Sequence, residues 1–432
     1  MVNQTEKTLS GEYETKVFLS SYSCERRELD AQKILSYLKK NNYTIITDPK
    51  KADYIILVTY GATKSLSDIS FKMIEKFKEY DAQLIVAGCI PETHKEQLGK
   101  IFTGITLPTQ NFDRIDEIFP INTIQFKDAE EGNYTWKNLN KRTPSGILKN
   151  INQQSIFFRT LTTFFIENIF KKILGRNFVK IFPFKNLVSE SGNYFILISR
   201  GCIHNCAYCI IRKAVGPLRS KPSDQCINEF REGLQQGFTN FVLEADDVGP
   251  YGVDIGGTLP DLLKQIVATE GNFTLELRNT HPFWIIKYID DLETLVKTRK
   301  IKSIFISIQS GNNRILKLMG RPYPIEKVVD AVSRLKSANP DLQVGVDLMV
   351  GFPTEKTEEF HETLRIIEQL HFDFGVVFPF CCHQETKASQ IEPKIPRKVI
   401  QQRLSETLRM LKQNNYFAWR FRSTGFISFY TR

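Results

Sequence analysis

The sequence predicts an α/β protein in which an open parallel α/β sheet is followed by a partial (β/α)6 barrel. Two observations support this fold class. Short apolar runs alternate with segments of helical periodicity before residue 114, and the same alternation resumes after residue 191. We therefore expect four parts: an N-terminal α/β domain at 1–114, a basic aromatic insert at 115–190, a partial barrel at 191–392 and a C-terminal helical tail at 393–432.

The N-terminal part contains three apolar runs that are typical of buried parallel strands, at 16–23, 54–61 and 83–89. Helical periodicity lies between them at 27–42 and 65–79. This order predicts an open parallel sheet, which usually binds its ligands at the C-terminal ends of the strands.

The third part repeats the pattern six times. The predicted strands are 194–199, 239–245, 272–278, 302–309, 343–351 and 374–380. The predicted helices between them are 223–236, 259–269, 285–298, 325–337 and 356–370. Six βα repeats predict a partial barrel, whose chemistry is expected at the C-terminal strand ends.

The insert carries most of the excess charge. The chain has a formal net charge of +10, and residues 141–190 hold nine Lys and Arg against two Glu. Within the insert, 155–174 has the spacing of an amphipathic helix. We expect this helix either to dock on a domain or to contact a membrane surface or another partner.

No apolar run is long enough to span a membrane, and the N-terminus lacks the apolar stretch of a signal peptide, so we expect a cytoplasmic protein. In a reducing compartment the eight cysteines are expected to be metal ligands or plain thiols rather than disulfides. In the tail, 398–415 has the pattern of one helix, and too few strand candidates remain for a small barrel.

The loop after the first barrel strand carries the strongest motif, CxxxCxxC, formed by Cys202, Cys206 and Cys209. Three thiolates in so short a loop can hold three irons of a 4Fe–4S cluster and leave the fourth open. An open iron suits binding of the amino and carboxylate groups of S-adenosylmethionine (SAM), and reduction then releases a 5′-deoxyadenosyl radical. The alternatives are a structural zinc site that uses Cys226, or thiols without a metal. His204, inside the motif, is expected to be a loop residue that faces solvent.

Three segments extend this interpretation: 200–222 around the cysteines, SIQSGNNRILKLMGRPY (307–323) and DLMVGFPTEKTEEFHET (347–363). They resemble the radical SAM core of methylthiotransferases, and the resemblance covers residues 16–110 and 191–392. It implies an enzyme that cleaves SAM reductively and inserts sulfur or a methylthio group at an unreactive C–H bond. It also implies an electron donor such as flavodoxin or ferredoxin, and a substrate that is tRNA, a protein or, in this chain, a small molecule.

The resemblance further implies a second, auxiliary cluster held by three cysteines of the N-terminal domain. Two of the three positions fall on Cys24 and Cys89, whereas the middle one falls on Tyr60. Either another group completes the auxiliary site, or the two cysteines carry no cluster. The family's C-terminal RNA-binding barrel is expected to be absent from this chain.

The same resemblance suggests SAM contacts, which are weaker than the cysteine motif. Tyr208 stands where the family has an aromatic residue near the adenine, and Asp247 matches the family segment after the second barrel strand. Asp246 stands where a Gln is usual. Gln309, Ser310 and Gly311 match the QSG motif at the fourth strand end. Each of these polar residues is either a ligand contact or part of the loop structure.

Two further functions stay open. One is a radical SAM enzyme without sulfur insertion that acts on a peptide or natural product. The other is a non-catalytic protein that binds a membrane or nucleic acid, which the intact CxxxCxxC and QSG motifs disfavour.

Overall fold

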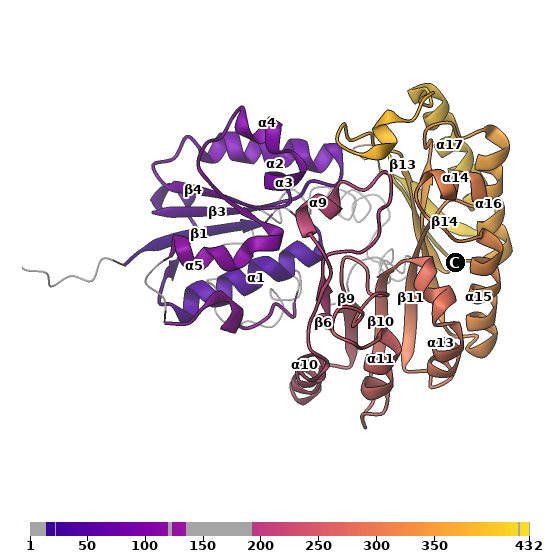
Figure 1. The fold of residues 1–432 in the computed structure, drawn as a ribbon, viewed down its shortest axis with the longest axis horizontal. Coiled ribbons are helices and arrows are strands. Elements are labelled where there is room, and N and C mark those ends of the chain that lie inside the picture. The colour runs from indigo at the N-terminus through magenta and orange to yellow at the C-terminus, as the bar shows by residue number, and fades with distance from the viewer. Residues whose placement is uncertain (1–13, 22, 120–122, 135–191, 422–423, 432) are drawn as a thin grey trace, which may run out of the picture.

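The computed structural model describes residues 14–21, 23–119, 123–134, 192–421 and 424–431 (Figure 1). The N-terminal domain is a five-stranded sheet in the order β2-β1-β3-β4-β5, and every pair is parallel. The strands are β1 (Lys16–Ser21), β2 (Thr44–Ile45), β3 (Tyr54–Thr59), β4 (Gln83–Gly88) and β5 (Ile105–Pro108). The predicted open parallel sheet is confirmed. The sequence pattern missed β2 and β5, which are short strands at the two edges of the sheet.

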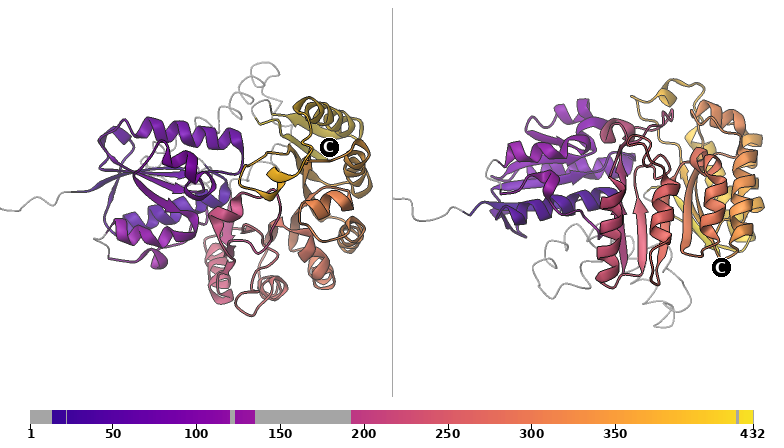
Figure 2. Two further views of the ribbon diagram at one scale, coloured as in Figure 1. Left: turned by 45° about the horizontal axis from the view of Figure 1, so that its top comes forward. Right: turned by 60° about the horizontal axis from the view of Figure 1, so that its bottom comes forward.

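Helices cover both faces of this sheet, as Figure 2 shows. Alternate strand residues pack on opposite faces: Val17 and Leu19 join the cluster with α1, whereas Phe18 joins the cluster with α2. This burial on both faces explains why the strands are continuous apolar runs. The helical segments are α1 (Glu25–Lys40), α2 (Lys64–Phe77), α3 (Ile90–Thr93), α4 (Lys95–Gly99), η1 (Pro49–Lys51), η2 (Thr109–Arg114), α5 (Ile115–Ile118) and η3 (Phe126–Asp128).

The N-terminal domain extends beyond the predicted boundary at residue 114. Ile115, Phe119 and Phe126 are buried in the same core as α1 and the sheet. The prediction of a separate insert is therefore wrong for its first residues, because their apolar side chains complete this core. The basic segment 141–190 and the predicted helix 155–174 lie outside the described residues.

The second domain is an eight-stranded sheet in the order β14-β15-β13-β12-β11-β10-β9-β6. Its six parallel strands all match predicted ones: β6 (Asn193–Leu197), β9 (Asn240–Glu244), β10 (Thr274–Thr280), β11 (Ile301–Gln309), β12 (Gln343–Val350) and β13 (Phe374–Pro379). A short antiparallel pair, β7 (Ser199–Arg200) and β8 (Arg219–Ser220), brackets the cysteine loop. Because β6 and β14 do not pair, the sheet stays open, as predicted for a partial barrel.

The main barrel helices bury apolar faces against the outside of this sheet. They are α10 (Ser223–Gln235), α11 (Leu259–Val267), α12 (Pro282–Lys287), α13 (Ile289–Val296), α15 (Ile325–Ala338), α16 (Thr357–Leu370) and α17 (Arg397–Gln413). Shorter segments are α9 (Ile211–Val215), α14 (Asn313–Leu318) and η5 (Lys387–Gln390). The single helix predicted at 285–298 is two helices, which meet at Tyr288 where the backbone leaves helical geometry (φ −106°, ψ 20°).

The predicted helical tail is only partly correct. After α17 the chain forms two strands, β14 (Tyr416–Arg420) and β15 (Ile427–Thr431), and β15 pairs antiparallel with β13. Both strands are rich in aromatic and β-branched residues, which favour strands, and β15 covers the edge that β13 would otherwise expose. The described residues after 392 add this hairpin to the barrel sheet and form no separate barrel.

Candidate active site

The cysteine loop (201–210) follows β6 and the short strand β7, and backbone contacts anchor it at several points. Gly201 has a positive φ of 81°, and a Cβ there would lie 1.9 Å from the carbonyl oxygen of Pro217, so only glycine fits. The Cys202 N–H donates to the Gly216 carbonyl (3.2 Å), and the Ala207 N–H donates to that of Met319 (2.8 Å). The backbone around the three cysteines is therefore positioned by main-chain contacts.

Cys202, Cys206 and Cys209 are free, partly buried thiols on this one loop. The His204 N–H donates to Cys202 Sγ (3.4 Å), and Arg321 Nη1 donates to Cys206 Sγ (3.5 Å). Burial raises the pKa of Cys202, and the Asp247 carboxylate raises it further. Burial also raises the pKa of Cys209, with a second contribution from Cys206.

These features fit a cationic iron–sulfur cluster. Buried neighbouring thiols ionise only when a positive group compensates their charge, and N–H donors to sulfur are typical of such clusters. Among the described residues, no three Cys, His, Asp or Glu side chains already form a metal site.

His204 does not face solvent as predicted. Its imidazole stacks on that of His281, with ring centroids 3.7 Å apart and an interplanar angle of 10°. His204 Nε2 lies 2.9 Å from Asp247 Oδ2 and 3.0 Å from the indole nitrogen of Trp284. Since Trp offers only a donor and the carboxylate only acceptors, one ring nitrogen cannot satisfy both at once. These contacts tie the cysteine loop to the ends of β9 and β10.

Asp247 is buried beneath this histidine. Its Oδ1 accepts the backbone N–H groups of Gly249 (3.0 Å) and His281 (3.1 Å). One carboxylate oxygen therefore shapes the loop after β9, and the other faces His204. The structure thus shows a loop-forming role for Asp247; its predicted contact with SAM stays a prediction.

Tyr208, within the cysteine loop, contacts Arg321, a residue that sequence reasoning missed. Arg321 Nη1 donates to the Tyr208 hydroxyl (2.8 Å) and Nε donates to that of Tyr323 (2.8 Å), while Nη2 donates to the Ser307 carbonyl. Arg321 belongs to the segment 307–323 that carried the resemblance, but nothing in its spacing indicated a contact with Cys206.

The QSG residues at the end of β11 divide into two roles. The Gly311 N–H donates to Thr363 Oγ1 (2.9 Å), and the Ser310 hydroxyl lies 3.4 Å from the same oxygen, so both attach the strand end to α16. Gln309 has a positive φ of 76°. Its side-chain oxygen is buried and has no hydrogen-bond partner. A buried acceptor without a donor is uncommon in folded proteins, so the predicted role of Gln309 as a ligand contact stays a prediction.

The structure brings Cys24, Tyr60 and Cys89 together at the C-terminal ends of the strands of the N-terminal sheet. They follow β1, β3 and β4, which are neighbouring parallel strands. Burial raises the pKa of Cys89 to about 11, although Arg27 lowers it. Burial also raises the pKa of Tyr60, and Cys24 contributes in the same direction. This site offers two thiols and a phenol, so it does not fit the three-cysteine set that the sequence resemblance implies.

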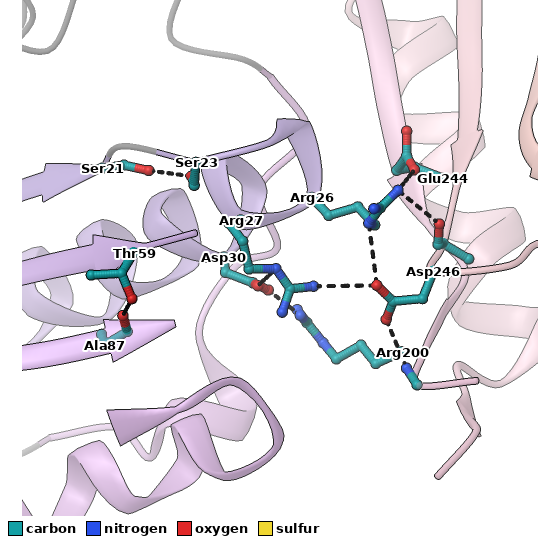
Figure 3. A network of polar contacts seen from close by, with 12 residues as sticks. Ser21, Ser23, Arg26, Arg27, Asp30, Thr59, Ala87, Arg200, Glu244 and Asp246 are labelled. Carbon is teal, nitrogen blue, oxygen red and sulfur yellow. Dashed lines mark hydrogen bonds and ion pairs between the residues drawn. The ribbon is translucent and has the colours of Figure 1, made fainter. Parts of the chain in front are cut away.

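A buried network of ion pairs joins this end of the N-terminal sheet to the barrel (Figure 3). Arg26 lies 3.2 Å from both Glu244 and Asp246, and Arg27 pairs with Asp30 (3.1 Å) and approaches Asp246 (3.9 Å). Further ion pairs join Arg200 to Asp30 and Arg278 to Glu25. Asp246 Oδ2 also accepts the Gly201 N–H (2.9 Å). The network thus links α1, beside Cys24, to the start of the cysteine loop.

Asp347 on β12 connects the two cysteine sites. Burial raises the pKa of this carboxyl group to about 7, although Arg321 and Arg26 lower it. Tyr60 also interacts electrostatically with Asp347. The carboxyl is therefore electrostatically coupled both to Arg321, which contacts the cysteine loop, and to Tyr60 of the N-terminal domain.

Comparisons with known proteins agree with this geometry. Residues 196–367 match the Radical SAM superfamily, and residues 16–107 match the Uncharacterized protein family UPF0004. No described helix has both the length and the apolar character needed to cross a membrane.

Three curated relatives illustrate the similarity. A probable threonylcarbamoyladenosine tRNA methylthiotransferase of Pyrococcus horikoshii is 27% identical over 83% of this chain and 75% of its own length. The ribosomal protein uS12 methylthiotransferase RimO of Acetivibrio thermocellus is 28% identical over 92% and 82%. The threonylcarbamoyladenosine tRNA methylthiotransferase MtaB of Aquifex aeolicus is 27% identical over 92% and 87%.

Among solved structures, the radical SAM methyltransferase TsrM of Kitasatospora setae, with cobalamin and a 4Fe–4S cluster bound, superposes with a TM-score of 0.57. The match covers 87% of this chain and 77% of that one at 13% identity, so it supports the fold. Together, the two matched domains, the relatives and the cysteine loop support the radical SAM methylthiotransferase family, whose cofactors are a 4Fe–4S cluster and SAM.

Proposed function

We propose that this enzyme cleaves SAM at a cluster held by Cys202, Cys206 and Cys209, and that it functionalises an unreactive C–H bond by inserting sulfur or a methylthio group. The observation that carries the proposal is the anchored three-thiol loop at the C-terminal end of β6, where barrel chemistry is expected. When bound, the cluster would supply the electron that converts SAM into a 5′-deoxyadenosyl radical.

The surrounding residues have separate roles in this proposal. Arg321 places a positive charge beside Cys206 and holds the Tyr208 ring by its hydroxyl. Gln309 offers an unpaired acceptor to a donor group of SAM. Asp247 supports the loop through His204, whereas Ser310 and Gly311 fix the end of β11 against α16.

The test uses anaerobically reconstituted full-length protein with dithionite and SAM. We expect roughly four irons per chain for one cubane, together with 5′-deoxyadenosine. Mass spectrometry of candidate substrates, incubated with and without sulfide, then reads the product. A protein that binds iron and SAM but forms no 5′-deoxyadenosine would refute the proposed reaction.

Tyr60 favours a second candidate, a radical SAM enzyme that does not insert sulfur and acts on a peptide or natural product. Two thiols and a phenol supply only two of the three soft ligands expected for an auxiliary cluster. The sulfide-dependent mass shift separates the two candidates: a modified product without added sulfur would support the second.

The substrate proposal follows the relatives, whose names refer to tRNA and to ribosomal protein uS12. We propose a substrate of tRNA, protein or small-molecule class, an electron donor such as flavodoxin or ferredoxin, and peripheral membrane contact through 155–174. The free thiols suit a reducing compartment such as the cytoplasm.

A further inference from the structure

The loop after β13 (381–391) contacts the N-terminal domain beside Tyr60. His383 Nε2 lies 3.0 Å from the carbonyl oxygen of Ala62, which stands two residues after Tyr60. Because a carbonyl oxygen can only accept a hydrogen bond, Nε2 carries the proton and is the donor. His383 therefore holds the loop that follows β3 from the barrel side.

A second histidine extends this contact toward Cys89. The His94 and His383 rings meet edge to face, with centroids 6.0 Å apart and an interplanar angle of 84°. Thr93 Oγ1 donates to the Cys89 carbonyl (2.9 Å) and lies 2.8 Å from His94 Nδ1. Since a hydroxyl has one proton to donate, His94 Nδ1 is the donor to Thr93. The two rings thus adjoin the turn that begins at Cys89.

The loop after β13 is also anchored to the cysteine loop. The Ala388 N–H donates to the carbonyl of Ala207 (2.8 Å), the residue after Cys206. Before this anchor, the His383 carbonyl accepts both the N–H (3.0 Å) and the hydroxyl (2.7 Å) of Thr386. Residues 383–388 therefore form one braced connection between the loop after β3 and the cysteine loop.

This connection and the ion network lie on different sides of the barrel. The network engages Asp246 after β9, whereas His383 follows β13, and three strands separate β9 from β13 in the sheet. The network holds α1, which begins after Cys24, and His383 holds the loop that follows Tyr60. The N-terminal domain is thus fixed against the barrel on both sides, each by its own contacts.

The histidine pair makes this connection sensitive to pH. Burial lowers the pKa of His94, and His383 lowers it further, whereas Asp68 and Glu385, which is paired with Lys213, act in the opposite direction. Burial also lowers the pKa of His383, although its backbone contact raises it. Because the folded pair binds fewer protons than free imidazoles, we expect the contact to be fully stable above about pH 6.5 and to weaken as the pH falls.

We propose that His383 is a positioning residue that fixes the Tyr60 loop relative to the cysteine loop. The proposal rests on the proposed function, because sulfur insertion would bring a substrate radical from the cysteine loop to the site of Cys24, Tyr60 and Cys89. His383 acts through the two loops and takes no chemical part in the reaction. Loss of its contact should make the separation of the two sites variable.

The experiment compares the reconstituted full-length wild type with His383→Ala and with His383→Gln, whose amide can still donate to the Ala62 carbonyl. Hydrogen–deuterium exchange of peptides covering 58–64 and 203–210 measures the two loops. In His383→Ala we expect exchange in both loops to rise about tenfold, as the loss of one hydrogen bond predicts. At pH 7.5, His383→Gln should stay close to the wild type. At pH 5.5, after correction for intrinsic exchange, the wild type should exchange faster, whereas His383→Gln should change less.

His361→Ala and His361→Gln on α16 are the matched controls, because His361 is exposed and pairs with Glu406. They should leave exchange in both loops unchanged. Exchange in His383→Ala that stays at the wild-type level, or that rises evenly over both domains, would overturn the positioning role. Dithionite-driven 5′-deoxyadenosine formation is measured in parallel. If the wild type forms none, the proposed function is wrong, whereas the exchange measurement still tests His383.

Discussion

The guanidinium of Arg26, in the N-terminal domain, lies 3.2 Å from the carboxylate of Asp246 in the barrel. The pair joins the helix that begins after Cys24 to the residue that accepts the Gly201 N–H at the start of the cysteine loop. Asp246 and Tyr60 are the two positions at which the sequence resemblance implies a departure from the family pattern, where Gln and a cysteine are expected. Both residues interact electrostatically with Arg26.

Asp246→Gln should weaken this interface. Removing one partner leaves the guanidinium partly buried with a single remaining carboxylate, Glu244, and we expect the free energy of unfolding to fall by about 2 kcal/mol. Urea unfolding, followed by circular dichroism, measures the change. Asp330→Asn, an exposed position on α15, is the control. Equal unfolding midpoints for Asp246→Gln and wild type would show that the pair contributes nothing to stability.

Replacement of Cys202, Cys206 and Cys209 together by Ala should abolish SAM cleavage, because thiolates are the soft ligands that iron–sulfur clusters require. The measurement is 5′-deoxyadenosine formed with dithionite after anaerobic reconstitution. Cys382→Ala removes an exposed thiol and should keep wild-type activity. Undiminished 5′-deoxyadenosine from the triple variant would remove the basis of the proposed function.

The site formed by Cys24, Tyr60 and Cys89 can be tested by removing thiols and by adding one. If Cys24 and Cys89 hold a cluster, changing both to Ala should lower the iron content by about four per chain and leave 5′-deoxyadenosine production intact. Tyr60→Cys would supply a third thiol and should raise the iron content if the native site holds none. Iron analysis of the three proteins measures this, and iron content that is the same in all of them would mean that these residues are not ligands.

Asp347 predicts a pH dependence of stability. Burial raises its pKa to about 7 in the folded protein, against about 4 for an unfolded Asp. Between these values the folded protein holds a proton that the unfolded chain has released. The contribution of this group to the free energy of unfolding is therefore fully present below about pH 4 and is lost as the pH rises through about 7.

Asp347→Asn should remove this contribution. Between pH 5 and 8 the stability of the variant should decline less than that of the wild type, which urea unfolding at successive pH values measures. Asp330→Asn should decline in parallel with the wild type. If Asp347→Asn also follows the wild-type curve, the carboxyl does not titrate in this range.

The segment 155–174 gives a prediction about partners. In the sequence its apolar residues form one stripe and its basic residues lie elsewhere, a pattern that favours intramolecular docking or membrane contact over RNA binding. We expect weak tRNA binding at physiological salt, and any binding to anionic vesicles should decrease when 155–174 is deleted. Co-sedimentation with vesicles and gel shifts with tRNA measure both. Tight tRNA binding that the deletion abolishes would instead indicate a tRNA substrate.

The sequence by itself determined the order of the long central strands and of most of the helices between them, because periodicity and apolar runs are local properties. The resemblance implied that Cys24, Tyr60 and Cys89 belong to one site, and the parallel strand order that the sequence predicted explains why they lie together, since parallel strands end on the same side of their sheet. The CxxxCxxC motif could be recognised in the sequence because its three thiols lie within eight residues.

Only the tertiary structure decided which distant side chains meet. Arg26 and Glu244 are 218 residues apart, and Arg321 and Cys206 are 115 residues apart, so no local pattern links them. His204 lies inside the motif, yet its burial depends on Asp247 and His281 from two other strand ends. The C-terminal hairpin was missed because its short aromatic strands become stable by pairing with β13, a partner that only the folded chain provides.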